Sequence, residues 1–146
     1  RSLITGRTFA IGVVPTDVML DLAQVAYFSA VFNGIVNAAE SHEHDVTLLT
    51  RSKGRIDSVL DGRTDGLVFI APQPDSPALL AARDRGIPHT VISTHVDWAP
   101  CVTGDNDAGV ALALGHLYEL GHRRIAHVAG NLDHEDARAR LAAYHA

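Results

Sequence analysis

The sequence predicts an α/β fold, namely a doubly wound parallel sheet with helices on both faces. Short apolar runs typical of strands alternate with helix-length segments whose apolar residues recur at helical spacing. The run Leu67–Ile70 is apolar throughout, which indicates a strand that is buried on both faces, as strands of parallel sheets are. The 146 residues, of which 47% are hydrophobic, suffice for one domain with its own core.

The first part of the chain predicts a strand, a loop, a helix and a second strand. Thr8–Val14 favours a strand that ends at Pro15, and residues 16–26 are expected to form an irregular loop. A polar cluster at residues 41–45 ends the helix before the second strand, Val46–Leu49. Two such strands joined by a helix form a right-handed βαβ unit. The apolar face of the helix is formed by Phe28, Val31, Phe32, Ile35 and Ala39.

The middle of the chain continues the alternation. Apolar residues within 56–60 indicate a short helix, and Asp65-Gly66 indicates a turn into the apolar strand that follows. Ser76-Pro77 predicts a helix start, because serine can accept free amide hydrogens and proline suits the first turn. A strand is expected over His89–Ser93, and a shorter one within Cys101–Gly104.

The last part predicts a helix, a strand and a final helix. Asp105–Asp107 should cap the first helix, and Gly121 can take the left-handed conformation that ends it. A strand is expected over Ile125–Ala129, followed by a helix from about Asp136 to Tyr144. The first helix is indicated by the spacing of Val110, Ala113, Leu114, Leu117 and Leu120.

This fold class predicts where a ligand binds. Doubly wound sheets bind ligands beyond the carboxyl ends of their strands, and those ends share one edge of the sheet. We therefore expect a candidate site at that edge. The segments that should gather there are Pro15–Asp17, Ala71–Gln73, Thr94-His95, Asp105-Asn106 and Gly130–Asp133.

Composition excludes several classes of protein. The net charge of -5 argues against this chain holding DNA by itself, because nucleic-acid affinity comes largely from lysine and arginine. No apolar run reaches the roughly 20 residues that span a bilayer. A single cysteine, Cys101, excludes an internal disulfide, and the first residues carry no export signal, so we expect a cytoplasmic protein.

No motif predicts an enzyme or a cofactor. The sequence lacks G-x-G-x-x-G after its first strand, the phosphate-binding G-x-x-x-x-G-K and the nucleophile motif G-x-S-x-G. Nine histidines raise the question of a metal, and His42, His44 and Asp45 are close in sequence. These three residues fall where a helix should end in solvent rather than converge on an ion, so we expect no metal site.

One stretch links the chain to a known family. In Leu117–Gly130 a helix ending L-x-x-L-G-H leads through x-x-I-A into a strand ending A-G, which resembles the signature of the lac repressor family of bacterial transcription regulators. Thr94-His95 departs from the Asp-Arg pair that many relatives carry. Further matches are Arg1–Leu3, Thr5–Thr8, Ile11–Pro15, Tyr27-Phe28 through Ile35, Asp65–Val68, Gly86–Pro88, Val102, Asp105-Asn106 and Arg140 before Tyr144.

The resemblance implies a domain arrangement. Residues 1–7 would be the linker that follows an absent DNA-binding headpiece, and residues 8–146 the N-terminal subdomain of a periplasmic-binding-protein-like type I core. A second subdomain would follow Ala146 and form the opposite wall of an effector cleft. Such a protein would bind a small-molecule effector, possibly a sugar or nucleoside, contact operator DNA through the headpiece and form a homodimer.

The resemblance also suggests effector contacts. Arg140 matches an arginine whose planar fork of donors often binds the effector in this family. Asp105 can contact an effector or simply cap its helix, and the first strand-helix loop often contributes contacts. The candidate residues are Asp17, Tyr27, Ala71, His95, Asp105 and Arg140. Alternative interpretations are a periplasmic sugar-binding protein of a transporter and a small α/β enzyme. Residues 1–8 resemble a repressor linker rather than the start of a secreted protein, which argues against the first alternative.

Overall fold

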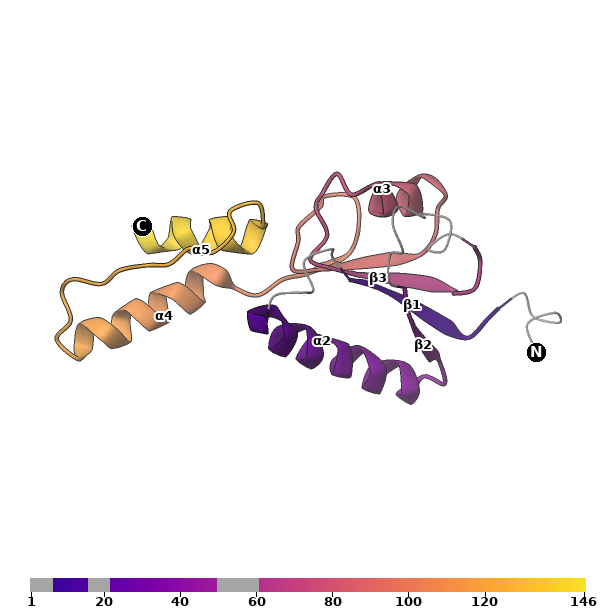
Figure 1. Ribbon diagram of the computed structural model, residues 1–146, viewed down its shortest axis with the longest axis horizontal. Coiled ribbons are helices and arrows are strands. Elements are labelled where there is room, and N and C mark those ends of the chain that lie inside the picture. Colours follow the sequence, from indigo (N-terminus) through magenta and orange to yellow (C-terminus); the bar gives the residue numbers. More distant parts are fainter. Residues whose placement is uncertain (1–6, 16–21, 50–60) are drawn as a thin grey trace.

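The computed structural model describes residues 7–15, 22–49 and 61–146, and these form a five-stranded parallel sheet with four helices (Figure 1). The strand order is β2-β1-β3-β4-β5. The predicted doubly wound α/β class is therefore confirmed. The strands are β1 (Ala10–Pro15), β2 (Asp45–Leu48), β3 (Gly66–Ile70), β4 (His89–Ile92) and β5 (Cys101–Val102).

Every strand pair in the sheet is parallel. Val13 of β1 lies between Leu48 of β2 and Val68 of β3, and Phe69 of β3 pairs with Val91 of β4. The short β5 continues this direction beside β4. Because all five strands point the same way, their carboxyl ends lie along one edge of the sheet.

The helices divide into two groups. Figure 1 shows α2 and α3 on opposite faces of the sheet, whereas α4 and α5 lie beside each other, away from the sheet and past its edge. No described helix is long and apolar enough to cross a membrane. The helices are α2 (Leu22–Ser41), α3 (Pro77–Asp84), α4 (Asn106–Glu119) and α5 (Glu135–His145).

The hydrophobic core lies between the sheet and α3. Leu79 of α3 is fully buried against Phe69 and Val91 of the sheet. Burial of each such side chain contributes roughly 1.5–3 kcal/mol. The remaining members of the core are Val14, Leu67, Ala78, Ala82 and Val96.

The opposite face of the sheet is less well covered. Over residues 26–41 of α2, only Ala39 is buried. A cavity of about 460 Å³ remains between α2 and the sheet, lined by apolar residues that include Ile35, Val68 and Ile92. The α3 face therefore supplies most of the packing that holds the sheet.

Two predicted helix starts differ in detail from the structure. Helix α2 begins at Leu22, so the loop predicted for residues 16–26 is wrong over its last five residues. The segment Leu22–Ala26 contains leucine, alanine and glutamine, whose helix propensity extends the helix toward the N-terminus. At α3, Pro77 is at the first turn as predicted, but Ser76 makes no side-chain capping bond.

The predicted strand Ile125–Ala129 is wrong, although its flanking elements are confirmed. Asp105 caps α4, and Gly121 has a φ of +92° after the helix end. The segment is extended with alternating exposure, but it pairs with no strand in the described ranges, and Val128 is 93% exposed. A strand needs a neighbouring ladder, and α4 has carried the chain past the sheet edge.

Three predictions lie outside the described residues. The short helix expected within 56–60 falls in the range 50–60, Asp17 falls in 16–21, and most of the expected linker falls in 1–6. Residues 8 and 9, which follow that linker, are described and contact the turn before β3.

Asp65 fastens the start of β1 to this turn. Its carboxylate accepts hydrogen bonds from the Thr8 amide at 2.7 Å, the Thr8 hydroxyl at 2.9 Å and the Phe9 amide at 2.8 Å. The Thr8 amide is the main cause of a lowered pKa of the Asp65 carboxyl, and partial desolvation opposes the shift. The ionised form is therefore the one that holds the two segments together.

This lowered pKa predicts an acid-dependent stability. The contribution of Asp65 is complete above its unfolded pKa of about 3.9 and is lost as pH falls through the lower folded value. We expect Asp65→Asn to lower the free energy of unfolding at pH 7 and to flatten its decline toward pH 2, measured by urea denaturation. Asp75→Asn, at an exposed loop residue, is the control. An Asp65→Asn protein with the wild-type acid profile would contradict this.

Candidate functional site

The carboxyl edge of the sheet carries unusual backbone conformations. Ala71 follows β3 with a φ of +47°, and Ser93 follows β4 with a φ of +64°. Residues other than glycine rarely adopt this left-handed region, and where they do they often lie at ligand sites. Hydrogen bonds hold both turns, because the Ala71 amide donates to the Ile92 carbonyl and the Ser93 amide to the Val102 carbonyl.

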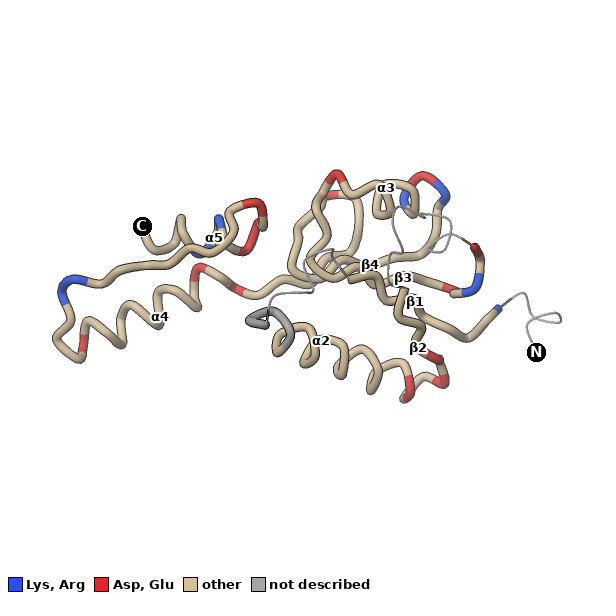
Figure 2. The backbone as a smooth tube through the Cα atoms, in the orientation of Figure 1, with Lys and Arg blue, Asp and Glu red and all other residues tan. Residues whose placement is uncertain are grey.

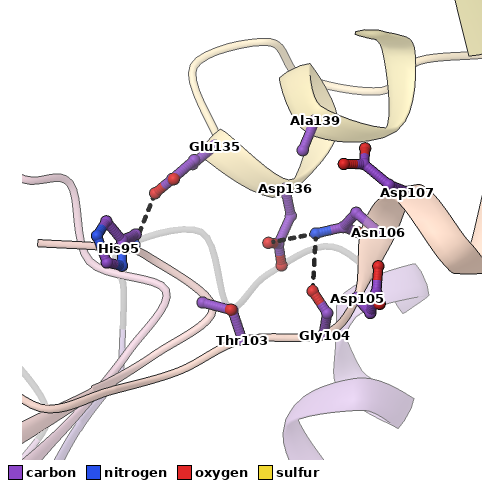
Figure 3. A pocket seen from close by; sticks show the side chains of 9 residues that line it. All are labelled: His95, Thr103, Gly104, Asp105, Asn106, Asp107, Glu135, Asp136 and Ala139. Atoms are coloured by element: carbon purple, nitrogen blue, oxygen red, sulfur yellow. Dashed lines mark hydrogen bonds between the residues drawn. The ribbon is translucent and has the colours of Figure 1, made fainter. Parts of the chain in front are cut away.

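A polar pocket of about 280 Å³ opens at this edge (Figure 3). Its walls come from three places: the turn after β4, the connection from β5 into α4, and the first turns of α5. The pocket thus lies where the sheet meets α4 and α5. The lining residues are His95, Thr103, Gly104, Asp105, Asn106, Asp107, Glu135, Asp136 and Ala139.

Side-chain hydrogen bonds cross this pocket. The His95 amide donates to Glu135 Oε2 at 2.6 Å, which links the β4 turn to α5. Asn106 Nδ2 donates to Asp136 Oδ1 at 2.9 Å, and Arg140 Nη1 donates to Asn106 Oδ1 at 3.1 Å. Asn106 therefore joins the start of α4 to two residues of α5.

The pocket is rich in carboxylates. Figure 2 shows acidic residues at the starts of α4 and α5, and four of them, Asp105, Asp107, Glu135 and Asp136, line the pocket. Each helix N-terminus offers roughly half a positive charge, which favours acids there. Asp105 also accepts a capping bond from the Ala108 amide at 2.9 Å. None of the four forms an ion pair within the described ranges.

The structure brings some of the predicted site residues together. His95 and Asp105 line the pocket, and Arg140 contacts it through Asn106. Tyr27 and Ala71 do not line it, although Ala71 lies at the same sheet edge and Tyr27 reaches that edge through a hydroxyl contact with Ser93. Asp17 is outside the described residues, so these six positions remain predictions as effector contacts.

Sequence reasoning missed other pocket residues. Glu135 and Asp136 read as ordinary acids in the first turn of a helix. Glu135 contacts His95, which is 40 residues earlier, so only the packing of α5 against the β4 turn reveals this role. The sequence places Gly130–Asp133, just before α5, at the same sheet edge, but as the end of a strand that the structure does not form.

The pocket chemistry suits a ligand rich in hydrogen-bond donors. Carboxylates and carbonyls accept hydrogen bonds from hydroxyl or amine groups, and Arg140 adds donors beside them. Among the described residues, no group of three or more His, Cys, Asp or Glu is arranged to hold a metal ion. Near the end of α2, His42 and His44 instead bond backbone carbonyls.

A parallel α/β sheet with a polar pocket at its carboxyl edge is the arrangement in which doubly wound α/β domains bind small molecules. The particular family follows from comparison with known proteins. A profile described as periplasmic binding proteins and the sugar-binding domain of the LacI family matches residues 10–146. The chain belongs to this family.

Similar proteins include several named regulators. The ribose operon repressor of Escherichia coli K12 is 27% identical over 100% of this chain and 46% of its own length. The transcriptional regulator RafR of Escherichia coli is 30% identical over 96% of this chain and 44% of its own length. The chain therefore spans less than half the length of these curated relatives.

Solved structures show the same fold. A complex of the regulator CelR with cellobiose superposes with a TM-score of 0.81 at 26% identity, covering 94% of this chain and 45% of CelR. The lac repressor dimer bound to operator and an anti-inducer superposes with a TM-score of 0.74 at 23% identity, covering 99% of this chain and 45% of the repressor.

The bonds of Asn106 predict a measurable coupling between α4 and α5. We expect Asn106→Ala to destabilise the contact by about 1 kcal/mol, because it removes the bonds to Asp136 and Arg140. Amide hydrogen exchange in α5 should accelerate, and thermal unfolding should shift downward. Asn37→Ala, at an exposed position of α2, controls for the gain in helix propensity. Equal exchange rates in the two variants would rule out this coupling.

Proposed function

We propose that this chain is the effector-sensing part of a bacterial transcription regulator of the LacI family. A small molecule bound at the carboxyl edge would change the affinity of the whole protein for operator DNA. The observation that carries the proposal is the position of the pocket, which has one wall on the sheet side, at His95, and another on α5, at Glu135 and Asp136. A ligand there would contact both parts.

The proposed mechanism is thermodynamic linkage. The bond between His95 and Glu135 joins the sheet side of the pocket to helix α5, and Asn106, at the start of α4, bonds Asp136 of α5. A ligand that bonds both walls would favour one relative placement of them. It can shift DNA affinity only by the difference between its affinities for the two placements, typically about 1–3 kcal/mol or 5- to 150-fold.

The proposed domain arrangement follows the family resemblance. Residues 1–7 would connect to a DNA-binding headpiece, and residues 8–146 would supply the N-terminal part of the effector core. The sheet up to Val102 would form one wall of the cleft. A second lobe would complete the other wall, with α4 and α5 leading toward it, because α4 has no buried residue of its own.

The proposed effector is an uncharged sugar or nucleoside. The family profile names a sugar-binding domain, and the similar CelR structure contains cellobiose. The carboxylates that line the pocket can accept hydrogen bonds from sugar hydroxyls. A phosphorylated ligand would face like charges from Asp105, Asp107, Glu135 and Asp136, only partly offset by Arg140 and the two helix ends.

The remaining proposals concern the whole protein. It would act in the cytoplasm as a homodimer, contact operator DNA through its headpiece and catalyse no reaction. A net charge of -5 on this chain fits DNA contacts made elsewhere. The alternative of a periplasmic transport protein shares the family profile, but the similar proteins described above are transcription regulators.

The test uses the full-length gene product and operator DNA selected from a random-sequence pool. We expect D-ribose, cellobiose or a nucleoside to change the DNA dissociation constant by about 5- to 150-fold, measured by fluorescence anisotropy at fixed salt. The isolated 146-residue chain is the control, because it lacks the proposed second lobe.

Three results would contradict the proposed function. The first is a full-length protein that selects no DNA sequence, and the second is turnover of one of these sugars by that protein. The third is micromolar binding of a sugar to the isolated chain by calorimetry, because the second lobe would then not be needed.

A further inference from the structure

Ser93 lies at the carboxyl end of β4, two residues before the pocket residue His95. Its side chain is polar, yet the residue is only 7% exposed. Its backbone takes the left-handed conformation with a φ of +64°. A buried polar residue in a strained conformation must be held by its neighbours, so its partners indicate what it does.

The hydroxyl of Ser93 contacts the hydroxyl of Tyr27, which belongs to α2. The two residues are 66 positions apart in sequence, and the contact joins α2 to the turn after β4. The backbone of Ser93 is also held, because its amide donates a hydrogen bond to the Val102 carbonyl at 2.9 Å. The turn after β4 therefore carries Ser93, which contacts Tyr27, and two residues later His95, which lines the pocket.

Tyr27 is held in place by its hydroxyl group but is otherwise accessible to solvent. Its hydroxyl is bonded to Ser93, while the residue as a whole is 50% exposed. A tethered tyrosine is a rigid surface with an apolar ring and a polar end, and such residues are common at binding sites. Sugars and nucleosides also combine apolar faces with hydroxyl groups, so the exposed ring suits the effector class proposed above.

We propose that Ser93 is a positioning residue for effector binding. Its hydroxyl holds the Tyr27 ring in one orientation at the carboxyl edge, so that the exposed ring is ready for the effector before it arrives. Such preorganisation raises affinity because the cost of ordering the side chain is met before binding. This role rests on the proposed function, because it requires an effector at this edge.

A purely structural role for the same contact predicts different results. In that case the bond would only attach α2 to the sheet, and its loss would change stability without changing ligand affinity. Thr94 provides a matched control, because it is the next residue, is also buried, and donates its hydroxyl to the Pro72 carbonyl at 2.8 Å. This hydrogen bond involves neither Tyr27 nor a residue that lines the pocket.

The first experiment follows the Tyr27 ring directly in the 146-residue chain. The chain contains three tyrosines, so labelling with 3-fluorotyrosine gives a simple fluorine NMR spectrum. Tyr27→Phe identifies the Tyr27 resonance by its loss. We expect Ser93→Ala to shift or broaden this resonance and to leave those of Tyr118 and Tyr144 in place. Thr94→Val should leave all three unchanged.

The second experiment measures affinity in the full-length protein by calorimetry, with D-ribose, cellobiose and adenosine as probes. For any probe that binds, we expect Ser93→Ala and Tyr27→Phe each to weaken binding by about 2- to 12-fold, the value of one hydrogen bond. The affinity of the double variant should equal that of the single variant that binds the probe less tightly, because both changes remove the same contact. Thr90→Val, which removes a hydroxyl bond to the Pro100 carbonyl at a residue that does not line the pocket, should bind as the wild type does.

Three results would overturn the role of Ser93. These are an unmoved Tyr27 resonance in Ser93→Ala, wild-type affinity in that variant, and effects of the two substitutions that add in full. Failure of the proposed function gives a different result, because the wild-type protein would then bind none of the probes. The proposed role of Ser93 would be rejected as well in that case. If the wild type binds and only the variants disagree, the proposed function stands.

Discussion

The parallel direction of all five strands is the constraint on which the rest of the structure depends. It gathers every strand end at one edge, so the turns after β3, β4 and β5 lie close together although they are distant in sequence. Such a sheet also requires cover on both faces, which α3 and α2 provide. The pocket forms because the starts of α4 and α5 also lie at this edge.

The hydrophobic core and the candidate site are formed by different residues in this fold. The apolar core lies between the sheet and α3, at Phe69, Leu79 and Val91, and none of these residues lines the pocket. The pocket is held together by polar bonds, such as those of Glu135 and Asn106. Polar contacts at a partly exposed edge open more readily than a packed core, so we expect local opening to begin at α4 and α5 rather than in the core.

Sequence patterns predict the sheet and its helices well, because apolar periodicity follows directly from burial. The capping of α4 by Asp105 and the left-handed Gly121 were likewise predictable from local chemistry. Strand pairing was not predictable in this way. Ile125–Ala129 is mostly apolar, as buried strands are, yet a strand also needs a partner strand beside it. Ser93 and Glu135 were missed because their roles depend on contacts with residues 66 and 40 positions away.

We propose that the carboxyl edge of this sheet is one wall of an effector cleft. A crystal structure of the full-length protein with its effector tests the claim most directly. We expect the ligand to contact His95 and Asp105 from one side and a second lobe from the other. A ligand bound at the opposite edge of the sheet, or enclosed by residues of a second lobe alone, would contradict it.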